Sequence, residues 1–167
     1  MNTPIEVGNG TLTMCGLNDF METVEGIDNP AVVTLCDKPH RQWHGETYCH
    51  YLSYKKFTPL ANWTAAAQKV MKLLDEGRDV VLHCIHGRDR TGTIAYVVMR
   101  HLEEIKHSGF EELGKLFNGM TYEEYEMLPH SKTLTAMYEA RPSMKRQWQT
   151  LMNERLSFHL QLLKSLD

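Results

Sequence analysis

The stretch from Val80 to Thr93 constrains the fold of this chain most, because it places a strand, a loop and a helix start within a few residues of one another. Residues 80–82 form a short apolar run, which predicts a strand buried on both faces, and apolar residues return at helical spacing from Ile94 onward. If the chain turns from strand end to helix start between them, the backbone N–H groups of residues 85–90 can converge on one point, assisted by the positive end of the helix. Such a point suits a phosphate group.

Two residues of this loop carry the chemistry. The field that attracts a phosphate also favours a thiolate, so Cys84 is expected to be ionised and nucleophilic at neutral pH. Arg90, six residues further on, can hold two phosphate oxygens through its planar guanidinium. The alternative is an ordinary buried cysteine beside a turn, which the density of the pattern makes a poor explanation.

The pattern His-Cys-x-x-Gly-x-x-Arg-Thr-Gly, from His83 to Gly92, resembles the signature of the cysteine-dependent protein tyrosine and dual-specificity phosphatases. The resemblance implies that Cys84 forms a phosphocysteine intermediate and that the Thr91 hydroxyl helps the thiolate to leave. His83 is expected to orient the loop rather than to act as an acid or a base. The phosphate would then be bound by Ile85, His86, Gly87, Arg88, Asp89 and Arg90, with Gly87 permitting a backbone conformation or a close approach that a side chain would obstruct.

Length and composition predict one compact α/β domain. The 167 residues are 42% hydrophobic and 23% charged, which suffices for a sizeable core. We expect residues 1–167 to form a single phosphatase-like domain with a central, mostly parallel sheet of about four to five strands flanked by helices. Strands are predicted at 11–15, 31–36, 48–52 and 80–82, and helices from the cap Asn18 to Glu25, from the cap Thr58 to Gly77, and from 141–143 as one long helix toward Leu163.

Charge and cysteine content exclude several classes of function. The formal net charge of −3 gives no global basic field that would recruit nucleic acid or a membrane surface. The amino-terminal residues lack a leader pattern, and no apolar run approaches the roughly 20 residues of a membrane helix. We therefore expect a cytoplasmic protein without membrane insertion. Four cysteines without zinc-like spacing predict reduced thiols, no metal and no cofactor.

Cys36 and Gln147 are two further residues that are expected to support the site. Carboxyl ends of parallel strands meet at one edge of a sheet, so Cys36 is placed near Cys84. In a relative, the tumour-suppressor lipid phosphatase, a cysteine at a similar place forms a reversible disulfide with the nucleophile; a plain core cysteine is the alternative here. The run Arg141-Pro-Ser followed by Gln147 or Gln149 resembles the last helix of dual-specificity phosphatases.

The general acid is the point at which the sequence departs from the family. Where relatives place an aspartate before the next helix, this chain has Lys55 and Lys56, neither of which is a natural proton donor at neutral pH. Asp89 is one candidate, as in myotubularin-like lipid phosphatases, although it could instead pair with a basic neighbour. A second possibility is that the acid comes from elsewhere in the chain; the candidates are His44, His50 and a glutamate of the 122–126 region. A third is that no acid is used, because the leaving group is itself a phosphate.

The predicted function is phosphomonoester hydrolysis, with a phosphorylated protein or another phosphomonoester as substrate. Arg88, Lys55 and Lys56 make polyphosphorylated substrates an alternative, such as a phosphoinositide, an inositol phosphate or an RNA 5′-triphosphate; the two lysines could equally be a solvated pair. The RNA 5′-triphosphate is included because His86 and Gly87 resemble the loop of capping-type RNA triphosphatases. RNA in general is not an expected partner. Arg41 either contacts further anionic groups or lies in a solvated loop. Two other classes of function are a catalytically weak phosphate-binding protein and a sulfurtransferase-type domain. The positions of Gly87 and Gly92 in the loop argue against the sulfurtransferase.

Overall fold

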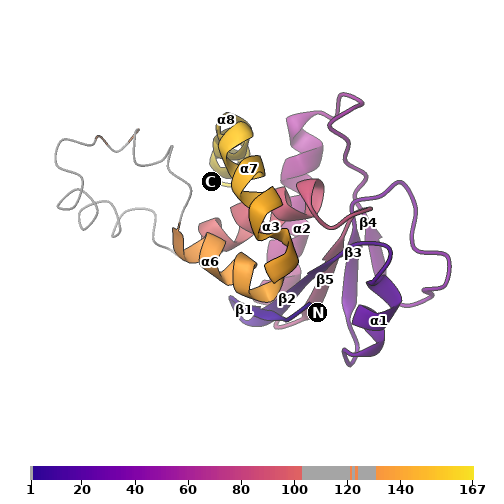
Figure 1. Cartoon of the computed structure of the whole chain (residues 1–167). Coiled ribbons are helices and arrows are strands. Elements are labelled where there is room, and N and C mark those ends of the chain that lie inside the picture. Colours follow the sequence, from indigo (N-terminus) through magenta and orange to yellow (C-terminus); the bar gives the residue numbers. More distant parts are fainter. Residues whose placement is uncertain (1, 103–120, 122, 124–130) are drawn as a thin grey trace.

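A computed structural model of the chain describes residues 2–102, 121, 123 and 131–167. Its centre is a five-stranded sheet of order β1-β2-β5-β3-β4 (Figure 1). The β1 strand is antiparallel to β2, and the other neighbours are parallel. The strands are β1 Ile5–Val7, β2 Gly10–Cys15, β3 Ala31–Thr34, β4 Thr47–Cys49 and β5 Asp79–His83. The predicted α/β fold with a mostly parallel sheet is therefore confirmed.

Helices cover both faces of this sheet (Figure 1). Side chains alternate along β5, so that Val80 and Leu82 join the larger core while Val81 packs with Phe20 of α1 in a smaller one. The larger core is closed by the long helices, whose apolar stripes include Trp63 of α2. The helical segments are α1 Phe20–Glu25, α2 Leu60–Asp75, α3 Asp89–Leu102, α6 Ser131–Ala140, the 3₁₀ turn η1 Pro142–Met144, α7 Lys145–Glu154 and α8 Leu156–Ser165.

The register of the parallel strands brings their carboxyl ends to one edge. His83 of β5 lies beside Cys15 of β2 on one side and beside Thr34 of β3 on the other, and Thr34 in turn lies beside Cys49 of β4. Ligands bind at this edge of open α/β sheets. Cys84 is the residue that follows β5 there, so the sheet itself positions the candidate nucleophile.

Several predicted boundaries are wrong. The β1 strand and α6 were not predicted, β3 ends two residues before the predicted Cys36, and β4 lies at Thr47–Cys49 rather than at 48–52. Asn18 does not cap α1, since the cap position is Asp19 and its carboxylate accepts the Gly16 N–H instead. Local composition did not reveal these limits because neighbouring strands and loops, distant in sequence, decide where pairing stops.

The predicted cap of α2 is also wrong. The Thr58 hydroxyl accepts the backbone N–H of Ser53 at 3.0 Å rather than one from the helix, and Pro59 takes the cap position. The loop before α2 is thereby closed on itself by a side chain. This arrangement fixes the path of the residues that lead from the sheet edge into the helix.

The single long carboxyl-terminal helix that the pattern predicts is broken at Arg155. This residue has φ −114° and ψ 19°, outside the helical region, and separates α7 from α8. The break redirects the chain so that α8 buries His159, Leu160 and Leu162 against the rest of the protein. The apolar stripe continues through the break, which is why periodicity alone reads it as one helix.

The stretch between α3 and α6 lies almost wholly outside the described residues. The short helices and turns predicted for 103–124 therefore stay predictions. Among the helices that the structure describes, none combines the length and apolarity of a bilayer span.

One buried histidine links α8 to α3. His159 is 1% exposed, and its Nε2 lies 2.9 Å from the Thr93 Oγ1. Burial lowers the pKa of His159 to about 4, with a smaller contribution from the nearby Arg155 guanidinium. Its neutral form is thus the one compatible with the folded state.

This histidine makes the fold sensitive to acid. Between about pH 6.5 and about pH 4 the unfolded chain binds a proton at His159 that the folded protein does not, so stability is complete above that window and falls as the pH is lowered through it. We expect His159 to contribute about 2 kcal/mol of the loss in unfolding free energy between pH 7 and pH 5. Urea unfolding of wild type and His159→Gln at both pH values measures this. The exposed His44→Gln serves as control, and an unchanged loss in His159→Gln would contradict the assignment.

Candidate active site

The loop that follows β5 forms the floor of a large cavity. Cys84 is only 3% exposed, at the point where the chain leaves the strand, and α3 begins at Asp89. The cavity measures about 910 Å³, and Cys84, Arg88, Asp89 and Arg90 line it together with residues of the segments that follow β3 and β4. The predicted loop residues are thus brought to one place.

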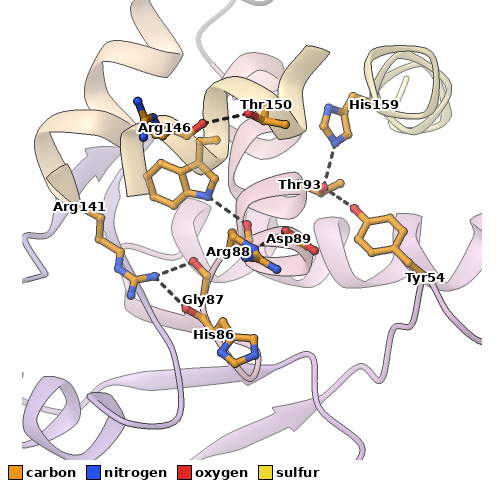
Figure 2. A network of polar contacts seen from close by, with 11 residues as sticks. Tyr54, His86, Gly87, Arg88, Asp89, Thr93, Arg141, Arg146, Thr150 and His159 are labelled. Carbon is orange, nitrogen blue, oxygen red and sulfur yellow. Dashed lines mark hydrogen bonds and ion pairs between the residues drawn. The ribbon is translucent and has the colours of Figure 1, made fainter. Parts of the chain in front are cut away.

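An arginine from the carboxyl-terminal part of the chain holds the middle of the loop. The Arg141 Nη1 donates to the Gly87 carbonyl at 2.6 Å and to the His86 carbonyl at 3.4 Å (Figure 2). Its other terminal nitrogen lies 3.7 Å from the Asp19 Oδ2. Arg141 is 7% exposed, so this is a buried, charge-assisted clamp on two loop carbonyls.

Two more donors hold the remaining carbonyls of the loop. The Trp148 indole Nε1 donates to the Arg88 carbonyl at 3.0 Å, and the Leu17 backbone N–H donates to the Ile85 carbonyl at 2.8 Å. By contrast, no hydrogen bond to the described residues uses the backbone N–H groups of residues 85–90. The loop therefore has its acceptors satisfied from outside and its donors free.

Two glycines allow this packing. Gly87 has φ +67°, and a Cβ there would stand 2.5 Å from the Cys15 carbonyl carbon and oxygen. A Cβ on Gly92 would stand 2.6 Å from the Trp148 Nε1. Gly87 is needed for both conformation and space, as the sequence predicts, and Gly92 is needed for space.

Backbone carbonyls fix the guanidinium of Arg90. Its Nη1 donates to the Leu52 carbonyl at 2.8 Å and to the Leu35 carbonyl at 3.1 Å. These carbonyls follow β4 and β3, the two strands beyond β5. Only part of the donor fork is used in this way, which leaves the other N–H groups of Arg90 toward the cavity that it lines.

His83 and Thr91 are both fully buried beside the nucleophile. The His83 Nδ1 lies 3.3 Å from the Cys84 carbonyl, and the ring packs on Phe20 with centroids 4.6 Å apart. Burial lowers the pKa of His83 to about 4, so its ring is neutral at physiological pH, which accords with an orienting role. The Thr91 Oγ1 has no hydrogen-bond partner within the described part of the chain.

The carboxylate of Asp89 is paired. Its Oδ1 accepts from the Arg88 Nε at 2.8 Å, the pairing that the sequence left open as the alternative to an acid role (Figure 2). Asp89 nevertheless lines the cavity, as do Lys55 and Lys56. The structure thus brings these groups to one cavity.

The other acid candidates lie elsewhere. His44 and His50 are outside the cavity lining, and Glu123 is exposed. The remaining glutamates of the 122–126 region lie outside the described residues. Gln147 is exposed on α7 and does not line the cavity, so its supporting role stays a prediction.

Cys36 lines the cavity together with Cys84, as the meeting of strand ends predicts. Burial raises the pKa of the Cys36 thiol and raises that of Cys15 to about 12, so both are neutral thiols. All four cysteines are free; the disulfide between Cys36 and Cys84 stays a prediction. Among the described residues no group of three metal-ligating side chains is found.

A polar network flanks the loop on the side of α8. The Tyr54 hydroxyl and the Thr93 Oγ1 lie 2.6 Å apart, and Thr93 also contacts His159 (Figure 2). Burial raises the pKa of Tyr54 to about 12, which keeps the phenol neutral. The Arg155 guanidinium lies over the Tyr54 ring, 3.5 Å from its centroid, and lines the cavity.

Sequence reasoning missed Arg141, Trp148 and Arg155 as site residues. They are spaced seven apart, so they share one face of the predicted helix with apolar residues such as Leu151. Two arginines on a stripe that otherwise faces the core are the signal that could have found them, because a charge there must meet a partner or a cavity.

Comparison with known proteins agrees with this geometry. Residues 33–108, which span β3 to α3 and the loop, match the model of the tyrosine phosphatase family. No curated protein matches the sequence.

Solved structures share the fold at low sequence identity. A kinase associated phosphatase whose catalytic-site cysteine is replaced by serine is 12% identical, with a TM-score of 0.53 over 92% of this chain and 94% of that one. OH1 from the Orf virus, described as a tyrosine phosphatase with triple substrate specificity, is 16% identical, with a TM-score of 0.52 over 98% and 86%. DUSP15 is 12% identical, with a TM-score of 0.51 over 99% and 96%. The loop and its supporting strands thus match the tyrosine phosphatase family model over residues 33–108, and the chain shares its fold with these phosphatases.

Proposed function

We propose that this protein hydrolyses phosphomonoesters through a covalent phosphocysteine at Cys84, with residues 1–167 acting as one domain. The observation that supports the proposal is the loop itself. Its carbonyls accept hydrogen bonds from outside the loop, while the N–H groups of residues 85–90 and part of the Arg90 fork have no partner among the described residues. Donors fixed in this way can stabilise the charge on a phosphoryl group in the transition state of its transfer, without having to reorganise.

The reaction has two steps. In the first, the Cys84 thiolate attacks phosphorus, a sulfur–phosphorus bond forms, and the bond to the ester oxygen breaks as the leaving alcohol or phenol takes up a proton. In the second, water attacks the phosphocysteine, releasing inorganic phosphate and the thiolate. The buried Thr91 hydroxyl, which has no partner among the described residues, is available to donate to that departing sulfur.

A phosphorylated tyrosine, serine or threonine of a protein fits this chemistry, and so does a polyphosphorylated small molecule. One observation also favours a second function, a phosphate-binding protein with slow turnover. Lys55 and Lys56, which the sequence places nearest the register of the usual acid, line the cavity, and the Asp89 carboxylate is held by Arg88. Tight retention of a phosphorylated ligand without phosphate release would favour this second function.

Replacing the nucleophile tests the proposal directly. We expect Cys84→Ser to lower p-nitrophenyl phosphate hydrolysis by on the order of a thousandfold or more, because serine at neutral pH is not ionised. The assay is run in chelator, with Cys49→Ser as control, since Cys49 is an exposed cysteine on β4. Equal rates for wild type and Cys84→Ser would refute the mechanism.

Asp89 is tested by the nature of the leaving group. If it donates the proton, Asp89→Asn should slow an alkyl phosphate such as a phosphoserine peptide by about a hundredfold, and an aryl phosphate by much less, because a phenolate leaves without help. Arg88→Gln is the matched control, since it breaks the same ion pair and keeps the carboxylate. Equal slowing of both substrates by Asp89→Asn would remove its assignment as acid.

The clamp on the loop makes a separate prediction. Arg141→Met leaves the Gly87 and His86 carbonyls without their donor, so we expect a loss of about 1–3 kcal/mol in unfolding free energy. We also expect kcat/KM to fall by a similar factor for aryl and alkyl phosphates, because the cradle rather than the proton transfer is disturbed. Thermal unfolding and steady-state kinetics measure both effects. Arg146→Met, on the exposed surface of α7, should change neither. Wild-type stability and wild-type kcat/KM in Arg141→Met would contradict the clamp.

A further inference from the structure

The cavity holds more positive charge than one phosphate requires. Its lining includes seven lysine or arginine side chains and two aspartates, in a chain whose formal net charge is −3. Arg90 is assigned to the reacting phosphate, and Arg88 is paired with Asp89. The cations that remain belong to three segments and are Lys38, Arg41, Lys55, Lys56 and Arg155.

Arg155 differs from the other four because its position is fixed. Its guanidinium stacks 3.5 Å from the centroid of the Tyr54 ring, and the ring is held in turn by the Tyr54 hydroxyl at 2.6 Å from Thr93. Thr93 is anchored by the buried His159 at 2.9 Å. Stacking uses the face of the guanidinium and leaves the N–H groups at its edge available.

No acidic group in the described part of the chain pairs with Arg155. The residue also stands where the helical path is broken, between α7 and α8, and not on a regular exposed face. A half-buried arginine that is oriented by an aromatic ring, lines a cavity and has no carboxylate partner among the described residues can receive an anion from outside.

The anion would lie close to the reacting phosphate. Thr93, which holds Tyr54, follows Arg90 by three residues in α3, so the two are about one helical turn apart. Arg155 and Arg90 line the same cavity. A ligand that occupies this cavity and carries two phosphates can therefore meet both guanidinium groups.

We propose that Arg155 binds a second phosphate of the substrate, and that the site accordingly takes a small polyol carrying two or more phosphates. This inference rests on the proposed hydrolysis at Cys84 and narrows its substrate class. A peptide with one phosphotyrosine would leave Arg155 and the lysines of the 53–58 loop without a partner, whereas a polyol bisphosphate engages both sides of the cavity. The polyol can be free or the headgroup of a lipid.

Kinetics with a matched pair of substrates test this assignment. Wild type, Arg155→Gln, Arg155→Lys and the control Arg146→Gln are assayed on an inositol monophosphate, a soluble inositol bisphosphate and p-nitrophenyl phosphate. We expect Arg155→Gln to raise KM for the bisphosphate by roughly tenfold or more, with KM for the other two within about twofold, because a charge-assisted contact to the second phosphate is lost. Arg155→Lys should keep part of the preference, and Arg146→Gln all of it.

A further arm separates the two sources of the polyol. Phosphatidylcholine vesicles that contain a phosphatidylinositol bisphosphate replace the soluble substrate, and an Arg155-dependent KM on either form supports the proposal. Equal effects of Arg155→Gln on all substrates, or none on any, would overturn it. So would a preference for a doubly phosphorylated peptide that Arg155→Gln leaves intact.

Binding distinguishes this inference from the hydrolysis on which it rests. The Cys84→Ser variant, with and without Arg155→Gln, is titrated calorimetrically with the inositol bisphosphate and with inorganic phosphate. A loss of roughly tenfold in bisphosphate affinity, with phosphate affinity unchanged, supports the second subsite even if wild type turns over no substrate. If wild type hydrolyses p-nitrophenyl phosphate and bisphosphate affinity does not depend on Arg155, the subsite is wrong and the hydrolysis stands.

Discussion

The orientation of the peptide groups in the loop after β5 is the constraint on which the site depends. A run of N–H groups can face an anion only if the carbonyls of the same peptides face away, and buried carbonyls need donors. The protein supplies those donors from distant parts of the chain: the Leu17 amide beyond β2, the Arg141 guanidinium and the Trp148 indole. The core, the strand order and the carboxyl-terminal helices can all be understood as the scaffold that holds these three donors around the loop.

Hydrogen bonds to backbone carbonyls also position Arg90. Arg90 is tied to the carbonyls of Leu35 and Leu52, which leave the sheet just past β3 and β4. The Leu35 carbonyl also accepts the Leu52 backbone N–H at 3.2 Å, so the two segments that receive the guanidinium are themselves joined by a hydrogen bond. Because the guanidinium is held by these carbonyls, its remaining donors stay directed at the cavity. The parallel register is therefore a condition of the site as well as of the fold.

The sequence predicts the parts of this arrangement that are local. The strand, the loop and the helix start from Val80 to Thr93 follow from an apolar run, a glycine at the tight position and a return of helical spacing. It does not predict β1, whose pairing depends on β2, or the break at Arg155, which tertiary packing imposes on a continuous apolar stripe. Arg141 and Trp148 were missed for the same reason, since which carbonyls they meet is decided by contacts more than fifty residues away.

The cations that line the cavity and the ion pair of Asp89 bear on two different quantities, substrate affinity and reaction rate. A fixed positive charge stabilises a bound phosphate in the ground state and in the transition state alike, so under the proposal Arg155 would lower KM without accelerating the chemical step. Proton donation would act on the transition state alone, and the Asp89 carboxylate in the loop is held by Arg88. Selectivity in such a site comes from how many anionic groups the substrate carries, and rate comes from how readily its leaving group departs. A polyphosphorylated substrate meets the first condition, and internal protonation by a neighbouring phosphate monoanion would help it to meet the second.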